Sequence, residues 1–344
     1  MKRRIVAWIG IVFTLVSLYI AFRDVHYRDI LETFRETEWW WAGPVLATFI
    51  LSIWLRAFRW KIMLAPIKEV SIGHSYSATM IGFMANNVLP MRLGELVRAY
   101  ALGHNSGVSK SSAFATIVVE RAFDLFAILL FLGVVLLRIR LSERMQIAGY
   151  IALAMCLGMF LLMAFLHFKR EATMSVFTFF ASRLPDPLED KVNGLMSRFL
   201  DGLLVLGSWK RIMWVALLSL ATWLSVGLGY WFTFFAFDLV LPLSASVVLV
   251  VTTALMVMLP SGPGFVGTFE VGAKYGMMIF HVSEEIALSY ALFYHAVMFF
   301  PITLLGFYHV WRDKFSFFAV AREEEPADAA PDGVEPGKED GAAP

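Results

Sequence analysis

Long apolar runs, each bounded by charged or aromatic residues, constrain the fold of this sequence more than any other feature. Of its 344 residues, 59% are hydrophobic and only 17% are charged, and the mean hydropathy is +0.68. A soluble domain has about 45–50% apolar and about 25% charged residues. Because a helix needs about 20 apolar residues to cross a bilayer, the sequence predicts an all-α polytopic membrane protein.

Six runs are long enough to be full membrane spans. They cover approximately residues 5–22, 39–63, 112–137, 146–168, 211–237 and 286–311. The first run could be a signal peptide, but it is longer than a normal signal apolar region and ends at Arg23-Asp24 without a small-residue cleavage site, so an uncleaved helix is predicted. Most basic residues near the spans favour cytoplasmic N- and C-termini in a cell inner membrane, although those at 23–35 and 138–144 fall on the opposite side.

The rest of the chain divides into an interfacial segment and a tail. Residues 171–208 alternate apolar and charged positions, which indicates amphipathic helices lying at the membrane interface, with a simple linker as the alternative. Residues 1–320 are expected to form one transmembrane domain. Residues 321–344 are rich in Glu, Asp, Pro, Ala and Gly, and cannot bury enough apolar surface to fold, so a disordered acidic tail is predicted.

Two related motifs interrupt the remaining apolar sequence, at residues 86–98 and 259–270. Each reads Leu-Pro, then a glycine-bearing turn, then a glutamate that opens a new helix. Lipid cannot satisfy the backbone groups that a broken helix releases, so each motif is expected to be the turn of a re-entrant or broken-helix hairpin buried in protein. The turn residues are Pro90, Gly94, Pro260, Gly262, Gly264 and Gly267. The predicted topology makes the hairpins enter from opposite sides, which is the pattern of an inverted repeat.

Charged residues inside two of the predicted spans need partners or water. Glu120, Arg121 and Asp124 lie within about one helical turn, and each intramembrane charge costs about 2.5–3.5 kcal/mol on insertion scales. They form either a structural salt-bridge cluster or part of a functional site. Arg56 and Arg59 lie near the end of the second span, where the preferred interpretation is that they extend to the lipid headgroups. Contact with an anionic lipid is the alternative.

Together, these residues predict a site for an anionic headgroup. The helices that restart after Pro90 and Gly264 would present positive N-terminal ends, and arginine binds phosphate through two parallel hydrogen bonds. The predicted site comprises Asn86, Asn87, Arg92, Glu95, Arg98, Glu120, Arg121, Asp124, Glu270 and Lys274. The glutamates could balance charge, bind a cationic moiety or carry protons. The alternative is that the prolines only kink helices, and that Glu95 pairs with Arg98 and Glu270 with Lys274.

Catalytic and cofactor chemistry find little support in the sequence. Ser261 lies outside the spacing of a nucleophile elbow, and no P-loop or other nucleotide motif occurs. His281, His295 and His309 recur every fourteen residues without a carboxylate at metal-ligand spacing, so they are interpreted as structural. Cys156 is the single cysteine, and no nucleic-acid-binding module is recognisable. No catalytic residue, metal or cofactor is predicted.

Three motifs of this chain resemble the lysylphosphatidylglycerol synthase transmembrane-region family, also called flippase-like proteins. They are Asn87-Val88-Leu89-Pro90-x-Arg92-x-Gly94-Glu95-x-x-Arg98, Val119-Glu120-Arg121-x-x-Asp124 and Leu259-Pro260-x-x-x-Gly264-x-x-Gly267-x-x-Glu270. The resemblance covers about residues 5–315. It implies a membrane domain that moves lipid, as the membrane part of full-length synthases is thought to move an aminoacylated phospholipid. Because only a short acidic segment follows Arg322, a stand-alone member without the aminoacyltransferase domain is expected.

The predicted function is therefore translocation or binding of a polar or anionic lipid. Stand-alone relatives are associated with diverse lipids, including glycolipid and hopanoid pathways, so the resemblance implies no particular substrate. One alternative is a membrane-embedded transferase for a lipid or glycolipid, with Glu120 or Asp124 as base. Another is a scaffold for a lipid-modifying complex. The expected partners are a membrane lipid and possible lipid-modifying enzymes, with no nucleic acid and the oligomeric state left open.

Overall fold

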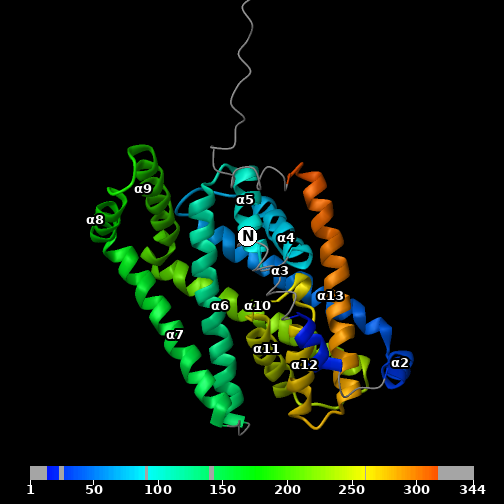
Figure 1. Cartoon of the computed structure of the whole chain (residues 1–344). Coiled ribbons are helices and arrows are strands. Elements are labelled where there is room, and N and C mark those ends of the chain that lie inside the picture. The colour runs from blue at the N-terminus through cyan, green and yellow to red at the C-terminus, as the bar shows by residue number, and fades with distance from the viewer. Residues whose placement is uncertain (1–13, 23–26, 90–91, 139–142, 260, 317–344) are drawn as a thin grey trace, which may run out of the picture.

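The computed structural model of the chain is a bundle of helices (Figure 1). It describes residues 14–22, 27–89, 92–138, 143–259 and 261–316. Besides a helical stretch over 14–22, the α-helices are α2 (Tyr27–Glu36), α3 (Ala42–Leu64), α4 (Ile72–Val88), α5 (Gly94–Ser106), α6 (Lys110–Arg138), α7 (Glu143–Phe168), α8 (Arg170–Ala181), α9 (Asp186–Asp201), α10 (Trp209–Ala236), α11 (Leu243–Val257), α12 (Thr268–Met278) and α13 (Glu284–Arg312). Short 3-10 turns cover Trp39–Trp41, Gly202–Gly207 and Pro263–Phe265. These residues contain no strand, so the predicted all-α class is confirmed.

Several helices have the length and composition of membrane spans. Three candidates are Trp39–Leu64, Trp209–Ala236 and Glu284–Arg312, and a fourth arises if Leu153–Phe168 and Arg170–Ala181 are counted as one span with a 90° bend. Helices α6 and α7 contain 29 and 26 residues. The chain is thus a multi-pass membrane protein. The number of six crossings stays a prediction, because the first span begins outside the described residues. The predicted acidic tail also lies outside them.

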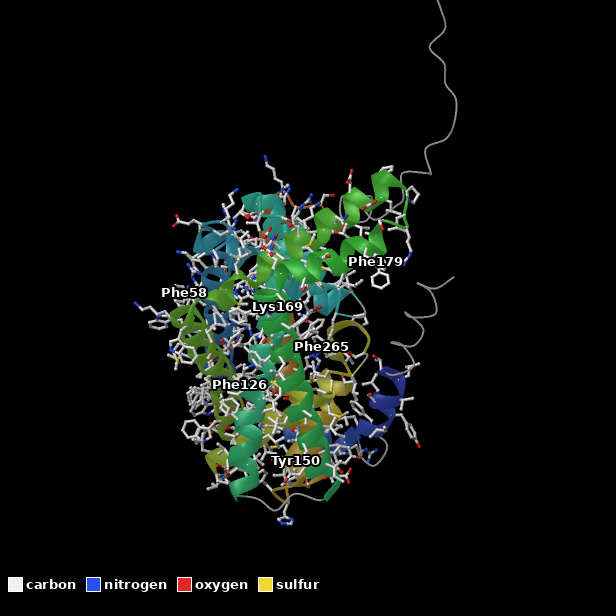
Figure 2. The ribbon with its side chains drawn as sticks, turned by 90° about the vertical axis from the view of Figure 1, so that its left-hand side faces the viewer. Phe58, Phe126, Tyr150, Lys169, Phe179 and Phe265 are labelled. Atoms are coloured by element: carbon white, nitrogen blue, oxygen red, sulfur yellow. The ribbon has the colours of Figure 1, made fainter. Side chains whose placement is uncertain are left out.

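Apolar side chains also cover the outside of the bundle, as expected where lipid is the solvent. Phe126, Tyr150 and Phe179 are exposed on α6, α7 and α8 (Figure 2), and their exposed fractions are 39%, 66% and 61%. Leu161 and Phe168 of α7 are more than 70% exposed. A soluble protein of this size does not leave such a continuous apolar surface in water.

The segment predicted to be interfacial folds into α8 and α9, which lie beside the upper end of α7 in Figure 1. Helix α9 packs on α6, where the Ser111 and Ser112 hydroxyls donate to the backbone oxygens of Leu195 and Arg198 at 2.9 and 2.8 Å. The segment is therefore helical and attached to the bundle. Its position at a membrane surface stays a prediction.

Two short helical hairpins, α4–α5 and α11–α12, occupy the middle of the molecule. Their helices have 17, 13, 15 and 11 residues, and therefore reach about 26 Å or less at 1.5 Å per residue. In Figure 1 the first hairpin lies in the upper half of the bundle and the second in the lower half, between the long helices α6 and α13. This is the arrangement expected for two hairpins that enter from opposite sides. The predicted turn residues Pro90 and Pro260 lie outside the described residues.

The helix packing repeats in the order long helix, hairpin, long helix. Helices α3 to α6 form the first set, and α10 to α13 form the second. Helix α3 packs against α10, while α4 packs against α13 just as α11 packs against α6. Exchanging the two sets therefore reproduces the same contacts. This packing pattern is the one that the predicted inverted repeat requires.

Within the first hairpin, α4 and α5 cross at a contact between two glycines. A Cβ atom added to Gly94 would lie 2.1 Å from the Gly82 carbonyl oxygen and 2.5 Å from the Asn86 side chain. A Cβ atom on Gly82 would lie 2.8 Å from the Cβ atom of Arg98. The two backbones can therefore approach closely only because both positions lack a side chain.

Replacing Gly94 with alanine is expected to lower the free energy of unfolding by about 1–3 kcal/mol, the usual effect of forcing extra atoms into a packed site. The matched control is Gly133→Ala on α6, where an added Cβ meets no atom within 4 Å. This control should be neutral or stabilise by about 0.4–1 kcal/mol. Unfolding of both variants in the same detergent measures the difference, and equal stabilities would contradict the close crossing.

Candidate functional site

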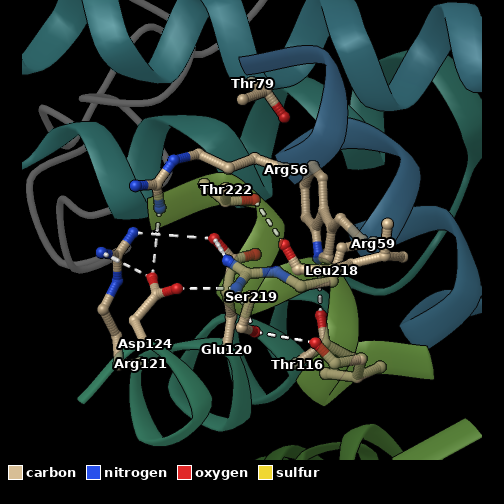
Figure 3. A network of polar contacts seen from close by, with 12 residues as sticks. Arg56, Arg59, Thr79, Thr116, Glu120, Arg121, Asp124, Leu218, Ser219 and Thr222 are labelled. Atoms are coloured by element: carbon tan, nitrogen blue, oxygen red, sulfur yellow. Dashed lines mark hydrogen bonds and ion pairs between the residues drawn. The ribbon is translucent and has the colours of Figure 1, made fainter. Parts of the chain in front are cut away.

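Buried charges from α3, α5 and α6 meet inside the bundle, and Figure 3 shows those of α3 and α6. Arg59 of α3 lies 2.6 Å from Oδ1 of Asp124 and 2.9 Å from Oε1 of Glu120, both on α6. Arg98 of α5 reaches the same Glu120 oxygen at 3.0 Å. Arg56 lies 3.2 Å from Oδ2 of Asp124. The two carboxylates of α6 thus hold three arginines from two neighbouring helices.

Side chains of α10 and α3 complete this network. The Ser219 hydroxyl lies 2.5 Å from Nη1 of Arg59, and the indole N–H of Trp223 donates to Oδ1 of Asp124 at 3.2 Å. The guanidinium of Arg98 lies 3.9 Å from the ring centre of Trp60, which is a cation–π contact. Four helices therefore fix the positions of the buried ions.

The preferred interpretation of Arg56 and Arg59 as residues that extend to the headgroups is wrong. The side chain of Arg59 is fully buried, and that of Arg56 is 8% exposed. Both point into the bundle, because the carboxylates of α6 supply charged partners at hydrogen-bond distance. An arginine with such partners has no need to reach the membrane surface.

Two pairings considered as alternatives are also wrong. Glu95 lies 3.6 Å from Arg121, whereas Arg98 pairs with Glu120. Glu95 and Arg98 lie on the same helix but pair with different residues of α6, Arg121 and Glu120.

In the second hairpin, Glu270 and Lys274 also pair with other residues and not with each other. Glu270 lies 2.5 Å from His295, and Lys274 lies 2.5 Å from Glu284. Lys274 also donates to the backbone oxygen of Ala21 at 3.1 Å. Glu270 and Lys274 therefore face α13, each with its own partner.

A cavity of about 450 Å³ borders the charged network. Its polar wall is formed by Arg56, Asn86, Arg92, Glu95, Arg98, Arg121 and Asp124. Apolar side chains of α6 and α7 form another wall, and they include Leu125, Ile128, Met155 and Met159. Met155 is 66% exposed on the outside of the bundle, so this wall reaches the surface that faces lipid.

Positive charge is in excess around this cavity. We call the set of Arg56, Arg59, Arg92, Arg98, Arg121, Glu95, Glu120 and Asp124 the arginine–carboxylate cluster. Five guanidinium groups face three carboxylates, so the cluster carries two excess positive charges. Its buried polar atoms without a hydrogen-bond partner include Nε of all five arginines, Nη2 of Arg98 and the acceptor Oε2 of Glu120. These atoms are enclosed by protein and do not open into the cavity.

Arg92 connects the two hairpins. It adopts a left-handed backbone conformation with φ 54° in the turn of the first hairpin. Its guanidinium donates a hydrogen bond to the backbone oxygen of Val257 and lies 5.2 Å from the ring centre of Phe265, both in the second hairpin. No described carboxylate lies within 4 Å of it, in contrast to the other arginines of the cluster. The turns of the two hairpins therefore meet at a cation.

The two asparagines of the first motif have different positions. Asn86 accepts a hydrogen bond from the backbone N–H of Gly94 at 2.8 Å, and so caps the start of α5 while lining the cavity. Asn87 faces α13 and donates to Oγ1 of Thr303 at 2.8 Å. It lines a second cavity of about 170 Å³. The predicted positive end of α5 is thus already occupied by Asn86.

The second hairpin borders this smaller cavity. Gly264, Phe265 and His295 line it, and Phe265 also lines the larger cavity. The backbone N–H of Gly262 donates to Thr14 Oγ1 at 2.7 Å, and that of Gly267 donates to Oε2 of Glu270 at 2.6 Å. The structure therefore divides the predicted site. Asn86, Arg92, Glu95, Arg98, Arg121 and Asp124 line the larger cavity with Glu120 behind them, whereas Asn87, Glu270 and Lys274 contact α13 or residues near it.

Sequence reasoning did not place Arg56, Arg59, Trp223 or His295 in this site. The two arginines had a usable signal, because they are charges inside an apolar span, like Glu120 and Asp124. Trp223 and His295 had none, since a single polar aromatic residue in a long apolar helix is common. Among the described residues, no group of three or more His, Cys, Asp or Glu side chains could hold a metal ion.

Comparison of the sequence with known proteins identifies a family and several relatives. Residues 7–306 match the family described as the lysylphosphatidylglycerol synthase TM region. A UPF0104 membrane protein of Methanothermobacter thermautotrophicus is 25% identical over 283 residues, which cover 76% of this chain and 81% of that protein. The UPF0104 membrane protein MJ1078 of Methanocaldococcus jannaschii is 24% identical over 66% of this chain and 94% of that protein.

A further relative is the glycosyltransferase AglD of Haloferax volcanii. It is 24% identical over 333 residues, which cover 86% of this chain but 52% of AglD. The chain thus spans about half the length of that relative. No solved structure matches the chain.

Proposed function

Because the chain belongs to the lysylphosphatidylglycerol synthase transmembrane-region family, we propose that it moves a lipid with an anionic headgroup between the two leaflets of a membrane. The observation that carries this proposal is the buried cavity beside the arginine–carboxylate cluster. Buried charges in a membrane protein face the protein interior or a water-filled cavity, and they commonly mark the path of a substrate.

The polar wall of the larger cavity suits a phosphate group. Two excess positive charges would be neutralised by an anion. Arginine's planar fork matches phosphate oxygens in pairs. Arg92, Arg98 and Arg121 are the side chains that we expect to bind the headgroup, while Arg56 and Arg59 hold the carboxylates of α6.

The apolar wall suits the remainder of the lipid. Leu125 and Ile128 of α6 and Met155 and Met159 of α7 continue from the cavity towards the lipid-facing surface. A headgroup in the cavity could leave its acyl chains in the bilayer beside these residues. One cavity with both kinds of wall thus fits an amphiphile better than a soluble anion.

The two hairpins supply a means of access from either side. They approach from opposite ends of the bundle, and their turns meet at Arg92, Val257 and Phe265. In transporters built from inverted repeats, one repeat moves against the other around a central site. We propose that movement of one hairpin relative to the other opens the cavity alternately to the two leaflets.

A reconstituted vesicle assay tests the proposal. The purified chain is placed in liposomes with fluorescent phosphatidylglycerol or phosphatidylcholine, and movement to the outer leaflet is followed by quenching of the label. We expect the anionic lipid to move faster than in protein-free vesicles, and faster than the zwitterionic lipid. If no lipid class moves faster than in protein-free vesicles, the chain is not a translocator under these conditions.

The name of one relative favours a second candidate function, a membrane-embedded transferase that acts on a lipid. That relative is a glycosyltransferase, although this chain spans only about half of it. Asp124 or Glu120 would then act as base. Their engagement with arginines argues against that role, because both carboxylates already accept hydrogen bonds from buried guanidinium groups. Analysis of lipids from a deletion strain separates the two: altered products favour a transferase, and an altered leaflet distribution of unchanged lipids favours translocation.

A further inference from the structure

We infer that Glu270 and His295 form a proton-binding site, and that loss of its proton releases the turn of the second hairpin from α13. The site borders the smaller cavity, which it shares with Arg56 of the arginine–carboxylate cluster. The inference about the proton stands on the geometry of this pair. Its coupling to lipid movement rests on the proposed function.

The two side chains are held by three polar contacts. Nδ1 of His295 lies 2.5 Å from Oε1 of Glu270, and Nε2 lies 2.9 Å from the backbone oxygen of Gly264. The other carboxyl oxygen of Glu270 accepts from the backbone N–H of Gly267 at 2.6 Å. Glu270 is 2% exposed, and the side chain of His295 is 13% exposed. His295 therefore fastens the turn to α13 through both of its nitrogens.

Donor and acceptor rules fix the number of protons in this arrangement. A carbonyl oxygen only accepts, so Nε2 of His295 must carry a hydrogen towards Gly264. The short contact between Nδ1 and Oε1 then requires one further proton. If it lies on Nδ1, the pair is imidazolium and carboxylate. If it lies on Oε1, the pair is neutral imidazole and carboxylic acid. Both forms have no net charge.

Removal of that proton changes the pair from attraction to repulsion. The lone pair of Nδ1 would then face a carboxylate, and the site would carry one uncompensated negative charge in a buried position. Such a charge inside a membrane protein is costly unless it gains water or a partner. The proton would pass to water in the smaller cavity, which His295 lines. We expect Glu270 to turn away from His295 and the turn to separate from α13.

The turn is built so that it can respond as a unit. Gly264, Phe265 and Gly267 all have positive φ values, of 67°, 60° and 88°. A Cβ atom on Gly264 would lie 2.5 Å from the Phe299 ring of α13, so the turn packs directly on that helix. Phe265 is one of the residues that line both cavities, and it contacts Arg92. Release of the turn would therefore move a residue that borders both the proton site and the cluster.

The other groups around the pair do not replace its proton. The titratable, charged or polar side chains that line the smaller cavity or pack beside the turn include Arg56 of α3, Arg92 of the first turn, Tyr230 of α10, Tyr294 of α13, Lys274 of α12, Asn87 of α4, Thr253 of α11, and Thr14 and Ser17 of the helical stretch 14–22. Helix α2 packs on this region through Ile30 and Phe34. Lys274 is already paired with Glu284. Arg56 shares the cavity and is paired with Asp124.

The test measures access to the smaller cavity as a function of pH. Cys156, the only cysteine of the sequence, is replaced by alanine, and Met298, which lines the cavity, is replaced by cysteine. The rate of labelling by a water-soluble thiol reagent is measured between about pH 5.5 and about pH 9, which includes the ordinary pKa of histidine. The same cysteine is placed in a Glu270→Gln variant. Gln can donate to Nδ1 and accept from Gly267 with the same shape, but it cannot lose a proton.

The ratio of the two labelling rates removes the pH dependence of the thiol itself. The ratio is the labelling rate of the chain with Glu270 divided by that of the Glu270→Gln variant. We expect it to be near one at low pH and about ten or more at high pH, a change equivalent to about 1.4 kcal/mol in the opening equilibrium. Glu270→Ala should label rapidly at every pH. Glu285→Gln, a matched change on α13 outside the pair, should keep the wild-type profile.

A constant ratio across the pH range would overturn the inference. Hydrogen–deuterium exchange of residues 262–270 in the unmodified chain gives a second readout that needs no substitution. It should rise with pH more steeply than exchange in α6, and equal profiles would also overturn the inference. These measurements use no transported lipid. A pH-dependent ratio without any lipid movement would therefore retain the proton site while rejecting the proposed function.

Discussion

Replacing Asp124 with asparagine is expected to lower the free energy of unfolding by about 3–5 kcal/mol, the range found when one partner of a buried ion pair is removed. Asp124 holds Arg56 and Arg59 at 3.2 and 2.6 Å and accepts from the Trp223 indole. Asparagine keeps the shape but removes the charge, so the cluster would carry three excess positive charges instead of two. Unfolding by sodium dodecyl sulfate in mixed micelles measures the loss.

A charge-balanced double variant makes this expectation specific. Arg56→Met combined with Asp124→Asn restores two excess charges, and should recover part of the lost stability, because the two residues are in direct contact. Asp190→Asn, at an exposed position of α9, is the matched control and should change stability by about 0.5 kcal/mol or less. If the double variant is less stable than the sum of the single changes, the charge-balance argument fails.

Replacing Arg92 with glutamine is expected to reduce movement of an anionic lipid by about tenfold or more. A hydrogen bond to a charged group contributes about 1.5–3 kcal/mol, and each 1.4 kcal/mol is a factor of ten. Arg92 is the arginine of the cluster that has no described carboxylate within 4 Å, so its charge is available to a ligand. Initial rates in the vesicle assay measure the effect.

Two variants separate a loss of charge from a loss of structure. Arg92→Lys keeps the charge but not the fork, and should retain an intermediate rate. Arg183→Gln removes an exposed arginine that stacks on Phe179 and Phe180, and should leave the rate unchanged. A scaffold for other enzymes predicts no effect of Arg92→Gln on cellular lipids as long as the protein folds. Wild-type rates in the Arg92→Gln variant would contradict the headgroup role.

The hairpins could be predicted from sequence because they follow from a local rule. A proline and glycines inside an apolar run release backbone groups, and lipid cannot satisfy them. This rule located the breaks at Leu89-Pro90 and Leu259-Pro260, close to Val88 and Val257, where α4 and α11 end. The charges of α6 could be predicted to need partners for a similar reason, since each is costly in lipid.

The partners themselves could not be predicted, because they depend on how distant helices pack. Arg59 meets Asp124 across 65 residues of sequence, and His295 meets Glu270 across 25. Sequence spacing instead suggested the pairs within one helix, such as Glu95 with Arg98. The structure turns those neighbours towards different helices, with Arg98 over Trp60 and beside Glu120. Nothing in a single apolar helix indicates which of its faces will meet a charge.

The ion pairs between the arginines of α3 and the carboxylates of α6 also affect how the chain enters the membrane during synthesis. Arg56 and Arg59 leave the ribosome 68 and 65 residues before the aspartate that neutralises them. At about 5–20 residues per second, α3 must wait on the order of several seconds for α6. Each unpaired arginine costs about 2.5–3.5 kcal/mol in lipid on insertion scales. We therefore expect α3 to remain beside the insertion machinery until α6 has been made, so that Arg56 and Arg59 enter the bilayer already paired with the carboxylates of α6.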